Sequence, residues 1–130
     1  MSNSTEQCLF CNKAKQKIIY SSKLVFVVRD SYPVTKLHTL IIPHRHVSDF
    51  FDLNDDELVD LNQILKKQRQ SILNLDKKIT GFNVGVNAGF DAGQSIMHCH
   101  IHLIPRRKGD IKNRRGGVRG VIPSKQEYNK

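Results

Sequence analysis

Three histidines that alternate with apolar residues are the side chains best suited to chemistry in this chain. His98, His100 and His102 lie in the run from Met97 to Pro105, and Cys99, Ile101 and Leu103 stand between and after them. Successive side chains of an extended strand point to opposite faces. The spacing therefore predicts a β-strand that carries three imidazoles on one face and buries the apolar residues on the other.

A polar, glycine-rich loop leads directly into the predicted strand. It runs from Asn87 to Ser95 and contains Gly93 and Gln94. Such loops let backbone N–H groups approach an anion closely. Imidazoles in a row beside an amide-rich loop predict a site for phosphate chemistry. A three-histidine metal site and a polar sheet face without function are the two other interpretations of the same residues.

The middle imidazole, His100, is the predicted nucleophile. A neutral imidazole has a pKa of about 6.5 in the unperturbed state and is largely unprotonated at neutral pH, so it can attack phosphorus without prior activation. Transfer to phosphorus then depends on positioning and on donors to the equatorial oxygens. The neighbouring imidazoles, the amides of residues 93–95 and the side chains of Gln94 and Ser95 supply such donors.

The pattern Asn-x-Gly-x-x-Ala-Gly-Gln-Ser-x-x-His-x-His-x-His-x-x-Pro-Arg, from Asn87 to Arg106, resembles the signature of the histidine triad (HIT) family of nucleotide hydrolases and transferases. The resemblance extends from Cys8 to Ile122. It implies a nucleotidyl-histidine intermediate on His100, from which water releases a nucleoside monophosphate. The catalytic residues it implies are His98, His100, His102 and Gln94, and the substrate-binding residues are Asp30, Asn87, Gly93 and Ser95.

A second block, from Leu37 to Val47, resembles another part of the family pattern, in which a strand ends at a proline and a histidine follows three residues later. His46 is the matching histidine. Two positions depart from that pattern: the family usually has glycine where this chain has Leu37, and lysine where it has His44. Asp30 matches an acidic residue that binds ribose hydroxyls, and on local grounds it is equally a turn-forming aspartate.

Cys8 and Cys11 form a Cys-x-x-Cys pair near the N-terminus, which is typical either of a redox pair or of half a zinc site. A redox pair is usually followed by a helix in a βαβ unit, and the lysine-rich residues 12–17 give at best a weak helix. We therefore favour structural zinc. By resemblance to family members with this pair, the ligands are Cys8, Cys11, His46 and His98.

The whole chain has the size and composition of one globular domain, residues 1–130, with residues 1–6 expected to be flexible. No apolar run approaches the ~20 residues that span a bilayer, and no secretory signal is present, so a cytoplasmic protein without a membrane partner is expected. The net charge is +9, and residues 106–130 carry nine Lys and Arg against two acids. This basic C-terminal extension either attracts polyanions or is a solvated tail.

The remaining elements predict an α+β fold. Four further strands are expected at residues 18–20, 24–29, 37–42 and 81–87. One long helix is expected from the N-cap Asn54, with Glu57 in capping-box position, to residues 74–76. The resemblance implies a HIT-like, five-stranded, mainly antiparallel sheet, and a homodimer that pairs through helix and strand.

The Pro-Arg-x-x-Gly-Asp run at residues 105–110 resembles the branch of the family that hydrolyses dinucleoside polyphosphates. We expect such substrates, because the basic extension would hold additional phosphates. Nucleoside phosphoramidates are the alternative substrates. A nucleic-acid-binding module is a third interpretation, but the few aromatic residues are not interleaved with the basic ones as stacking platforms would be.

Overall fold

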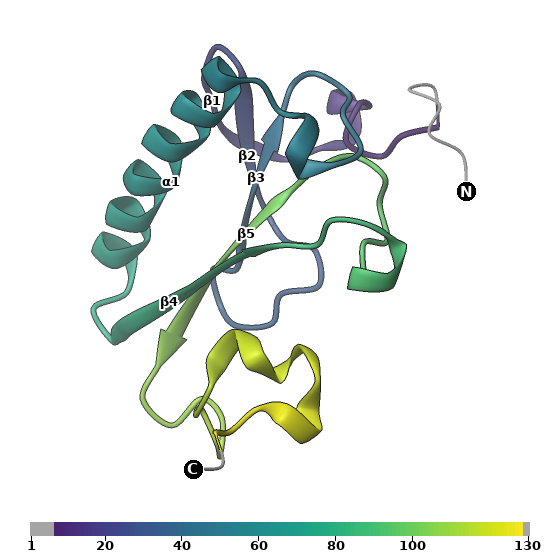
Figure 1. Ribbon diagram of the computed structural model, residues 1–130. Helices are drawn as coiled ribbons and strands as arrows, with labels where there is room; N and C mark the ends of the chain where they lie inside the picture. The colour runs from purple at the N-terminus through teal and green to yellow at the C-terminus, as the bar shows by residue number, and fades with distance from the viewer. Residues whose placement is uncertain (1–6, 129–130) are drawn as a thin grey trace.

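The computed structural model describes residues 7–128, so the flexibility expected for residues 1–6 concerns a part of the chain outside it. Five strands form one sheet in the order β1-β2-β3-β5-β4, and each neighbouring pair is antiparallel (Figure 1). Their bounds are Ile18–Ser21 (β1), Val25–Arg29 (β2), Thr39–Pro43 (β3), Ile79–Val86 (β4) and Ile101–Arg107 (β5). The predicted α+β class with a five-stranded antiparallel sheet is confirmed.

The single long helix, α1, runs from Asp55 to Leu75 and covers one face of the sheet (Figure 1). The predicted capping box is present: the Asn54 side chain accepts from the backbone N–H of Glu57, and the Glu57 side chain accepts from that of Asn54. Leu61 and Ile64 pack from α1 onto the sheet residues Val25, Val27, Ile41 and Ile101. None of the helices among residues 7–128 combines the length and the apolarity that crossing a membrane requires.

The opposite face of the sheet has a smaller core, which the N-terminal segment covers. Phe10 is buried there against Phe26, Val28, Leu40 and Ile42. In β2 and β3 these residues alternate with the residues that face α1, as the pleat of a strand requires. His102 pairs with Leu40 across the two strands and therefore lies on this same face of the sheet. The N-terminal segment with Phe10 is thus close to His102, although the two are far apart in sequence.

The histidine strand is shorter than predicted. β5 begins at Ile101, so His102 lies in the strand but His98 and His100 precede it. The backbone before Ile101 pairs with a loop and not with a strand, because the N–H of Cys99 donates to the carbonyl of Val47, in the loop after β3, at 2.7 Å. The predicted alternation nevertheless persists, because Cys99, Ile101 and Leu103 are all at most 3% exposed and face α1.

The basic C-terminal extension is folded on itself beside β4 (Figure 1). It contains two short 3-10 helices, η4 (Gly117–Val121) and η5 (Pro123–Lys125). The Gln126 side chain donates to the carbonyl of Asn113, and Arg115 forms an ion pair with Glu127. Several of its charges are thus partnered within the segment or next to it.

Candidate active site and metal centre

A cavity of about 630 Å³ lies on the sheet face opposite α1, between the N-terminal segment and the end of β5. Five of the predicted site residues line it: Asp30, Asn87, Ser95, His100 and His102. The rest of its wall includes apolar side chains, namely Leu9, Phe10, Ile19, Val28, Leu40 and Ile96. The site therefore offers an apolar slot with imidazole, amide and hydroxyl groups at one end, and the wall also carries the cations Lys15, Lys17 and Arg29, which suits a nucleoside with its phosphate.

The proton positions on His100 follow from its contacts. Its Nδ1 lies 2.8 Å from the backbone carbonyl of His98. A carbonyl oxygen only accepts, so Nδ1 carries the proton and donates it. The Nε2 of neutral His100 then has a free lone pair. This is the atom that a nucleophilic imidazole needs, and its ring borders the cavity.

His102 is held by a chain of hydrogen bonds from the neighbouring strand. The backbone N–H of Val34 donates to Nδ1 of His38 at 3.0 Å, so neutral His38 carries its proton on Nε2. That Nε2 lies 2.9 Å from Nδ1 of His102 and 3.4 Å from a carboxylate oxygen of Asp30. Nδ1 of His102 is therefore an acceptor, and its Nε2–H is available to donate to a ligand.

Burial keeps His102 uncharged. Desolvation, followed by the neighbouring His100 and His38, lowers the pKa of His102 to about 4, against an opposing contribution from the Asp30 carboxylate. Desolvation also lowers the pKa of His38, with Asp30 again opposing. At neutral pH both imidazoles are neutral. In the ligand-free protein, neutral His102 can therefore donate a hydrogen bond from Nε2.

Sequence reasoning missed His38 as a site residue. It is 2% exposed, and its position one residue before β3 places it beside His102 in the sheet. The only signal was its place in the second family-like block.

Leu37, where the family usually has glycine, has φ +73°, a left-handed conformation that costs about 1–2 kcal/mol for a residue with a side chain. Its side chain packs against the Ile72, Ile79 and Leu103 cluster, which offsets that cost.

The glycine-rich loop is braced internally. The Gln94 side chain is 3% exposed; its amide donates to the carbonyls of Ser48 and Ile96, and its oxygen accepts from the N–H of Gly89. Gly89 and Gly93 have φ of +100° and +96°, which favours glycine at both. Gln94 and Gly93 lie outside the cavity lining, so the structure places them as residues that shape the loop carrying Asn87 and Ser95.

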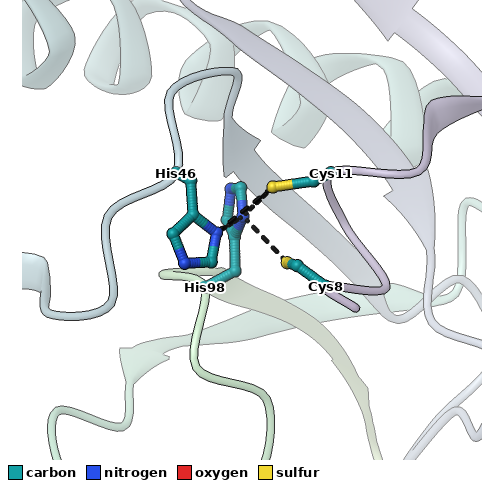
Figure 2. A group of neighbouring side chains, drawn as sticks. All are labelled: Cys8, Cys11, His46 and His98. Carbon is teal, nitrogen blue, oxygen red and sulfur yellow. Dashed lines mark hydrogen bonds between the residues drawn. The ribbon is translucent and has the colours of Figure 1, made fainter. Parts of the chain in front are cut away.

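The four predicted metal ligands converge at one point. Cys8 and Cys11 come from the N-terminal segment, His46 from the loop after β3, and His98 from the segment before β5 (Figure 2). Nδ1 of His98 lies 3.3 Å and 3.5 Å from the two sulfurs and 3.2 Å from Nδ1 of His46. Around a tetrahedral zinc ion, ligand atoms stand about 3.3–3.8 Å apart, as Zn–N and Zn–S bonds of about 2.0 and 2.3 Å require.

The donor chemistry fits a cation. Nε2 of His98 donates to the carbonyl of Pro43 at 2.8 Å, which leaves its Nδ1 lone pair directed at the sulfurs. Burial and the neighbouring Cys8 thiol raise the pKa of Cys11 to about 11, so a thiolate there requires the charge of a bound ion. Nε2 of His46 is buried and has no hydrogen-bond partner among residues 7–128. Of the two histidines, therefore, only His98 is oriented by a hydrogen bond from its other ring nitrogen.

The candidate metal site and the predicted nucleophile are adjacent. His98 supplies one ligand from its ring and, through its carbonyl, accepts from His100. Phe10, between the two cysteines, packs edge-on against both imidazoles, with ring centroids 5.9 Å from His98 and 5.2 Å from His100. Sequence reasoning did not select Phe10, although its place inside the Cys-x-x-Cys pair ties it to the metal site.

The arginines expected to hold phosphate lie at the other end of β5. Arg106 pairs with Asp110 and donates to the Asn83 side chain at 2.7 Å. Arg107 pairs with Asp76 and donates to the carbonyl of Lys36. Neither arginine lines the cavity. Their contacts hold the chain after β5 to β4 and to the segment after α1, and give no support to the expected role in phosphate binding.

Comparisons with known proteins agree with this arrangement. An uncharacterised HIT-like protein of Methanocaldococcus jannaschii is 35% identical over 107 residues, which cover 79% of this chain and 81% of that protein. The AP-4-A phosphorylase of Mycobacterium tuberculosis is 38% identical over 94 residues, which cover 72% of this chain and 48% of the enzyme. The asymmetrical bis(5'-nucleosyl)-tetraphosphatase of Schizosaccharomyces pombe is 36% identical over 95 residues, or 73% of this chain and 52% of the enzyme. The chain thus matches about half the length of each named enzyme.

A solved structure of similar fold is described as zinc-bound. The Zn-bound histidine triad family protein from Mycobacterium smegmatis superposes with a TM-score of 0.75 at 27% identity, covering 85% of this chain and 82% of that one. The HIT domain model matches residues 12–109, which hold the whole sheet and all three histidines. With that match, and with its imidazoles gathered at the start of β5, the chain belongs to the histidine triad (HIT) family.

Proposed function

We propose that this protein hydrolyses nucleotidyl compounds at the α-phosphorus through a covalent intermediate on His100. The observation that carries the proposal is the hydrogen bond from His100 Nδ1 to the His98 carbonyl, because it leaves Nε2 as a lone pair beside the cavity. Members of the family are nucleotide hydrolases and transferases, which supports the reaction class.

In the first step, Nε2 of His100 forms a bond to phosphorus while the bond from phosphorus to the leaving group breaks, with the two in line. The leaving group departs with the bonding electron pair, as an anion or after taking a proton from solvent. The Nε2–H of His102, together with Asn87 and Ser95, donates hydrogen bonds to the phosphoryl oxygens as charge moves. Water then attacks phosphorus, the N–P bond breaks, and a nucleoside monophosphate leaves.

The nucleoside is expected in the apolar part of the same cavity. Phe10, Val28 and Leu40 offer a slot for a flat base, and the Asp30 carboxylate lies at its edge. One oxygen of Asp30 accepts from the N–H of Tyr32 at 2.8 Å, so this residue is a turn former as well as a candidate ribose ligand. The two roles are compatible, because each carboxylate oxygen has two lone pairs and can accept a further hydrogen bond besides its contact with Tyr32 or His38.

Dinucleoside polyphosphates remain a candidate substrate class, which the tetraphosphatase and the phosphorylase among the relatives support. The positions of Arg106 and Arg107 give this class no support, because both are paired with carboxylates and neither lines the cavity. Nucleoside phosphoramidates are the second candidate. A panel with diadenosine tetraphosphate, adenosine phosphoramidate and adenylyl-lysine tests the reaction: wild type should cleave at least one, and the same protein with His100→Ala should cleave none.

Zinc at Cys8, Cys11, His46 and His98 is proposed as a structural ion, because protein atoms fill all four positions of a tetrahedron. When bound, it supplies a fixed anchor for His98, and with it for the carbonyl that orients His100.

A homodimer is also proposed. β4 is one of the two edge strands of the sheet, and an edge of eight residues can pair with a second copy of the chain. The cytoplasmic location stays a prediction.

A further inference from the structure

The cavity that holds the histidines extends across four strands, and its other end is lined by lysines. One row of paired residues crosses the sheet from β5 to β1, through His102, Leu40, Val28 and Ile18. Beyond this row the lining continues into the segment before β1, with Lys15, Gln16 and Lys17. At a strand spacing of about 4.8 Å, β1 lies roughly 14 Å from β5. The two lysines therefore belong to the nucleoside end of the cavity and not to the end at the histidines.

These two lysines carry charge that the described part of the chain does not neutralise. Both side chains are exposed, and neither forms an ion pair among residues 7–128. Arg29, the third cation of the wall, donates to the Thr39 hydroxyl at 2.7 Å, so its guanidinium has a partner. Asp30 is the one acid among the lining residues, and its oxygens contact the Tyr32 N–H and the His38 ring. The wall at this end therefore has a net positive charge.

Hydrogen bonds hold the segment that bears the lysines in place. The Gln16 side chain donates to the carbonyl of Leu9 at 3.0 Å, and the Gln16 N–H donates to the carbonyl of Lys13 at 3.1 Å. Lys13 itself does not line the cavity, and its ammonium contacts Nδ1 of His44. The two lysines of the wall stand on either side of the fixed Gln16, so their backbone positions are set by the fold.

The same segment runs beside the candidate ribose ligand, Asp30. Ile18 pairs with Val28 in an antiparallel ladder, so the residues before Ile18 run alongside those after Val28. Continued by two residues, this register brings Gln16 opposite Asp30, with a lysine before it and a lysine after it. In the proposed function the Asp30 carboxylate accepts from a ribose hydroxyl. The lysines therefore border the edge of the ribose.

A phosphate monoester on the ribose is the group that matches this edge. Near neutral pH such a group carries a charge of about −1.5 to −2 and has three acceptor oxygens. Lysine binds phosphate as a point charge on a flexible stem, so two lysines can reach one phosphate from either side. The phosphate would occupy the 2' or the 3' oxygen, and Asp30 would accept from the hydroxyl that remains. An unmodified nucleoside would leave both ammonium groups facing water.

We propose that Lys15 and Lys17 form an anion subsite for a phosphate monoester on the ribose of the bound nucleotide. The proposal rests on the proposed hydrolase function and deepens it. The substrate class is a nucleotidyl compound whose nucleoside carries a second phosphate on its 2' or 3' oxygen. That phosphate takes no part in the reaction: water is added across the bond from the α-phosphorus to the leaving group, and the product is a nucleoside bisphosphate.

Nucleotide binding to the wild-type protein tests the subsite without relying on turnover. Calorimetric titrations should give a Kd about tenfold lower for adenosine 3',5'-bisphosphate or adenosine 2',5'-bisphosphate than for adenosine 5'-monophosphate, as two exposed charged contacts warrant. The isomer that binds more tightly identifies the oxygen that carries the phosphate. Adenosine 5'-diphosphate is the matched ligand, because it has the same number of phosphates and none on the ribose. It should bind less tightly than the preferred bisphosphate.

Substitution of the lysines supplies the second arm of the test. Lys15→Met/Lys17→Met keeps two long aliphatic side chains and removes both charges, so the advantage of the bisphosphate over the monophosphate should fall to about twofold or less. Lys23→Met is the matched control. Lys23 is an exposed lysine between β1 and β2 and does not line the cavity, so this variant should keep the wild-type advantage.

Other results would overturn the subsite or the hydrolase separately. Equal affinity of wild type for the monophosphate and for both bisphosphates would show that the subsite is wrong and would leave the hydrolase standing. An advantage that persists in the double variant would do the same. If the diphosphate gains as much as the bisphosphates, the lysines hold the 5' phosphate chain and the subsite is wrong. Tighter bisphosphate binding by a protein that cleaves none of diadenosine tetraphosphate, adenosine phosphoramidate and adenylyl-lysine would support the subsite and overturn the hydrolase.

Discussion

The ring nitrogen Nδ1 of His100 lies 2.8 Å from the backbone carbonyl of His98, and the ring of His98 points away from it into the Cys8–Cys11–His46 cluster. One residue therefore connects the candidate metal site and the proposed nucleophile by two different groups, its imidazole and its carbonyl. In the proposed mechanism, His100 keeps the tautomer with a free Nε2 lone pair only while the backbone at His98 stays in place. The predictions below concern the groups that hold this arrangement.

Replacement of His38 should impair turnover through His102. His38→Phe removes the Nε2–H that His102 accepts, so we expect kcat to fall at least about tenfold with little change in KM. His38→Gln, whose amide can place an N–H near the same point, should restore part of the rate. Nitrogen NMR of the imidazoles supplies the readout that a purely structural role would not change: His102 should be the Nε2–H tautomer in wild type and a mixture in His38→Phe. An unchanged tautomer with a lowered rate would contradict this role.

Stability should fall as the pH drops below 6.5. Burial and the neighbouring imidazoles lower the pKa of His102 to about 4, whereas its value in the unfolded chain is about 6.5. Between these values the unfolded state binds a proton that the folded state does not, so the stabilising contribution is present above 6.5 and is lost as the pH falls toward 4. Urea unfolding at pH 8 and pH 5 should show a loss of about 1–2 kcal/mol from this residue. The loss should be smaller by that amount in His102→Gln, and an equal loss in both proteins would refute the assignment.

The capping box of α1 also holds the loop that bears His46. Glu57 is 2% exposed and accepts from the backbone N–H of Asn54 and from two nitrogens of Arg45, the residue before His46. These donors lower its pKa, against the opposing effect of burial. Glu57→Ala leaves them unsatisfied, so thermal or urea unfolding should show a loss of about 2–4 kcal/mol. Asp56→Ala, an exposed neighbour in the same helical turn, is the control and should cost well under half as much.

Loss of a cysteine ligand should release the metal. Wild type should contain about one zinc per chain by elemental analysis, as one tetrahedral site requires. Cys11→Ser should lose that zinc, melt at a lower temperature and lose activity indirectly, because His98 is no longer anchored. Cys99→Ala is the matched control: Cys99 is buried among the α1-facing residues and is no ligand, so this variant should keep its zinc. Native protein without metal, or with Cys8 and Cys11 joined in a disulfide, would instead support the redox interpretation.

The parts of the site that the sequence predicted are those set by local periodicity or by residue chemistry. Alternation placed Cys99 and Leu103 on the core face, and the Asn54–Glu57 spacing gave the start of α1. The convergence of Cys8, Cys11, His46 and His98 was predicted because few residue types bind zinc and the family pattern supplied the pairing. All of these depend on short-range order or on a small set of possible partners.

What the sequence did not predict depends on contacts between distant segments. The start of β5 is set by the hydrogen bond from Cys99 to Val47, about fifty positions earlier, which no periodicity encodes. The contacts of Arg106 are with Asp110 and Asn83, whereas from the sequence its run was expected to hold phosphate. The tautomer of His102 depends on Val34 and His38, which only the packing of β3 against β5 brings within reach.

The central claim, covalent catalysis by His100, is tested most directly by trapping the intermediate. Wild-type protein mixed with an adenosine phosphoramidate and quenched within one turnover should contain a peptide that is heavier by one adenylyl group, and fragmentation should locate that group on His100. His100→Ala should yield no such peptide and no turnover. An adenylyl group on another residue, or hydrolysis by His100→Ala at the wild-type rate, would contradict the account.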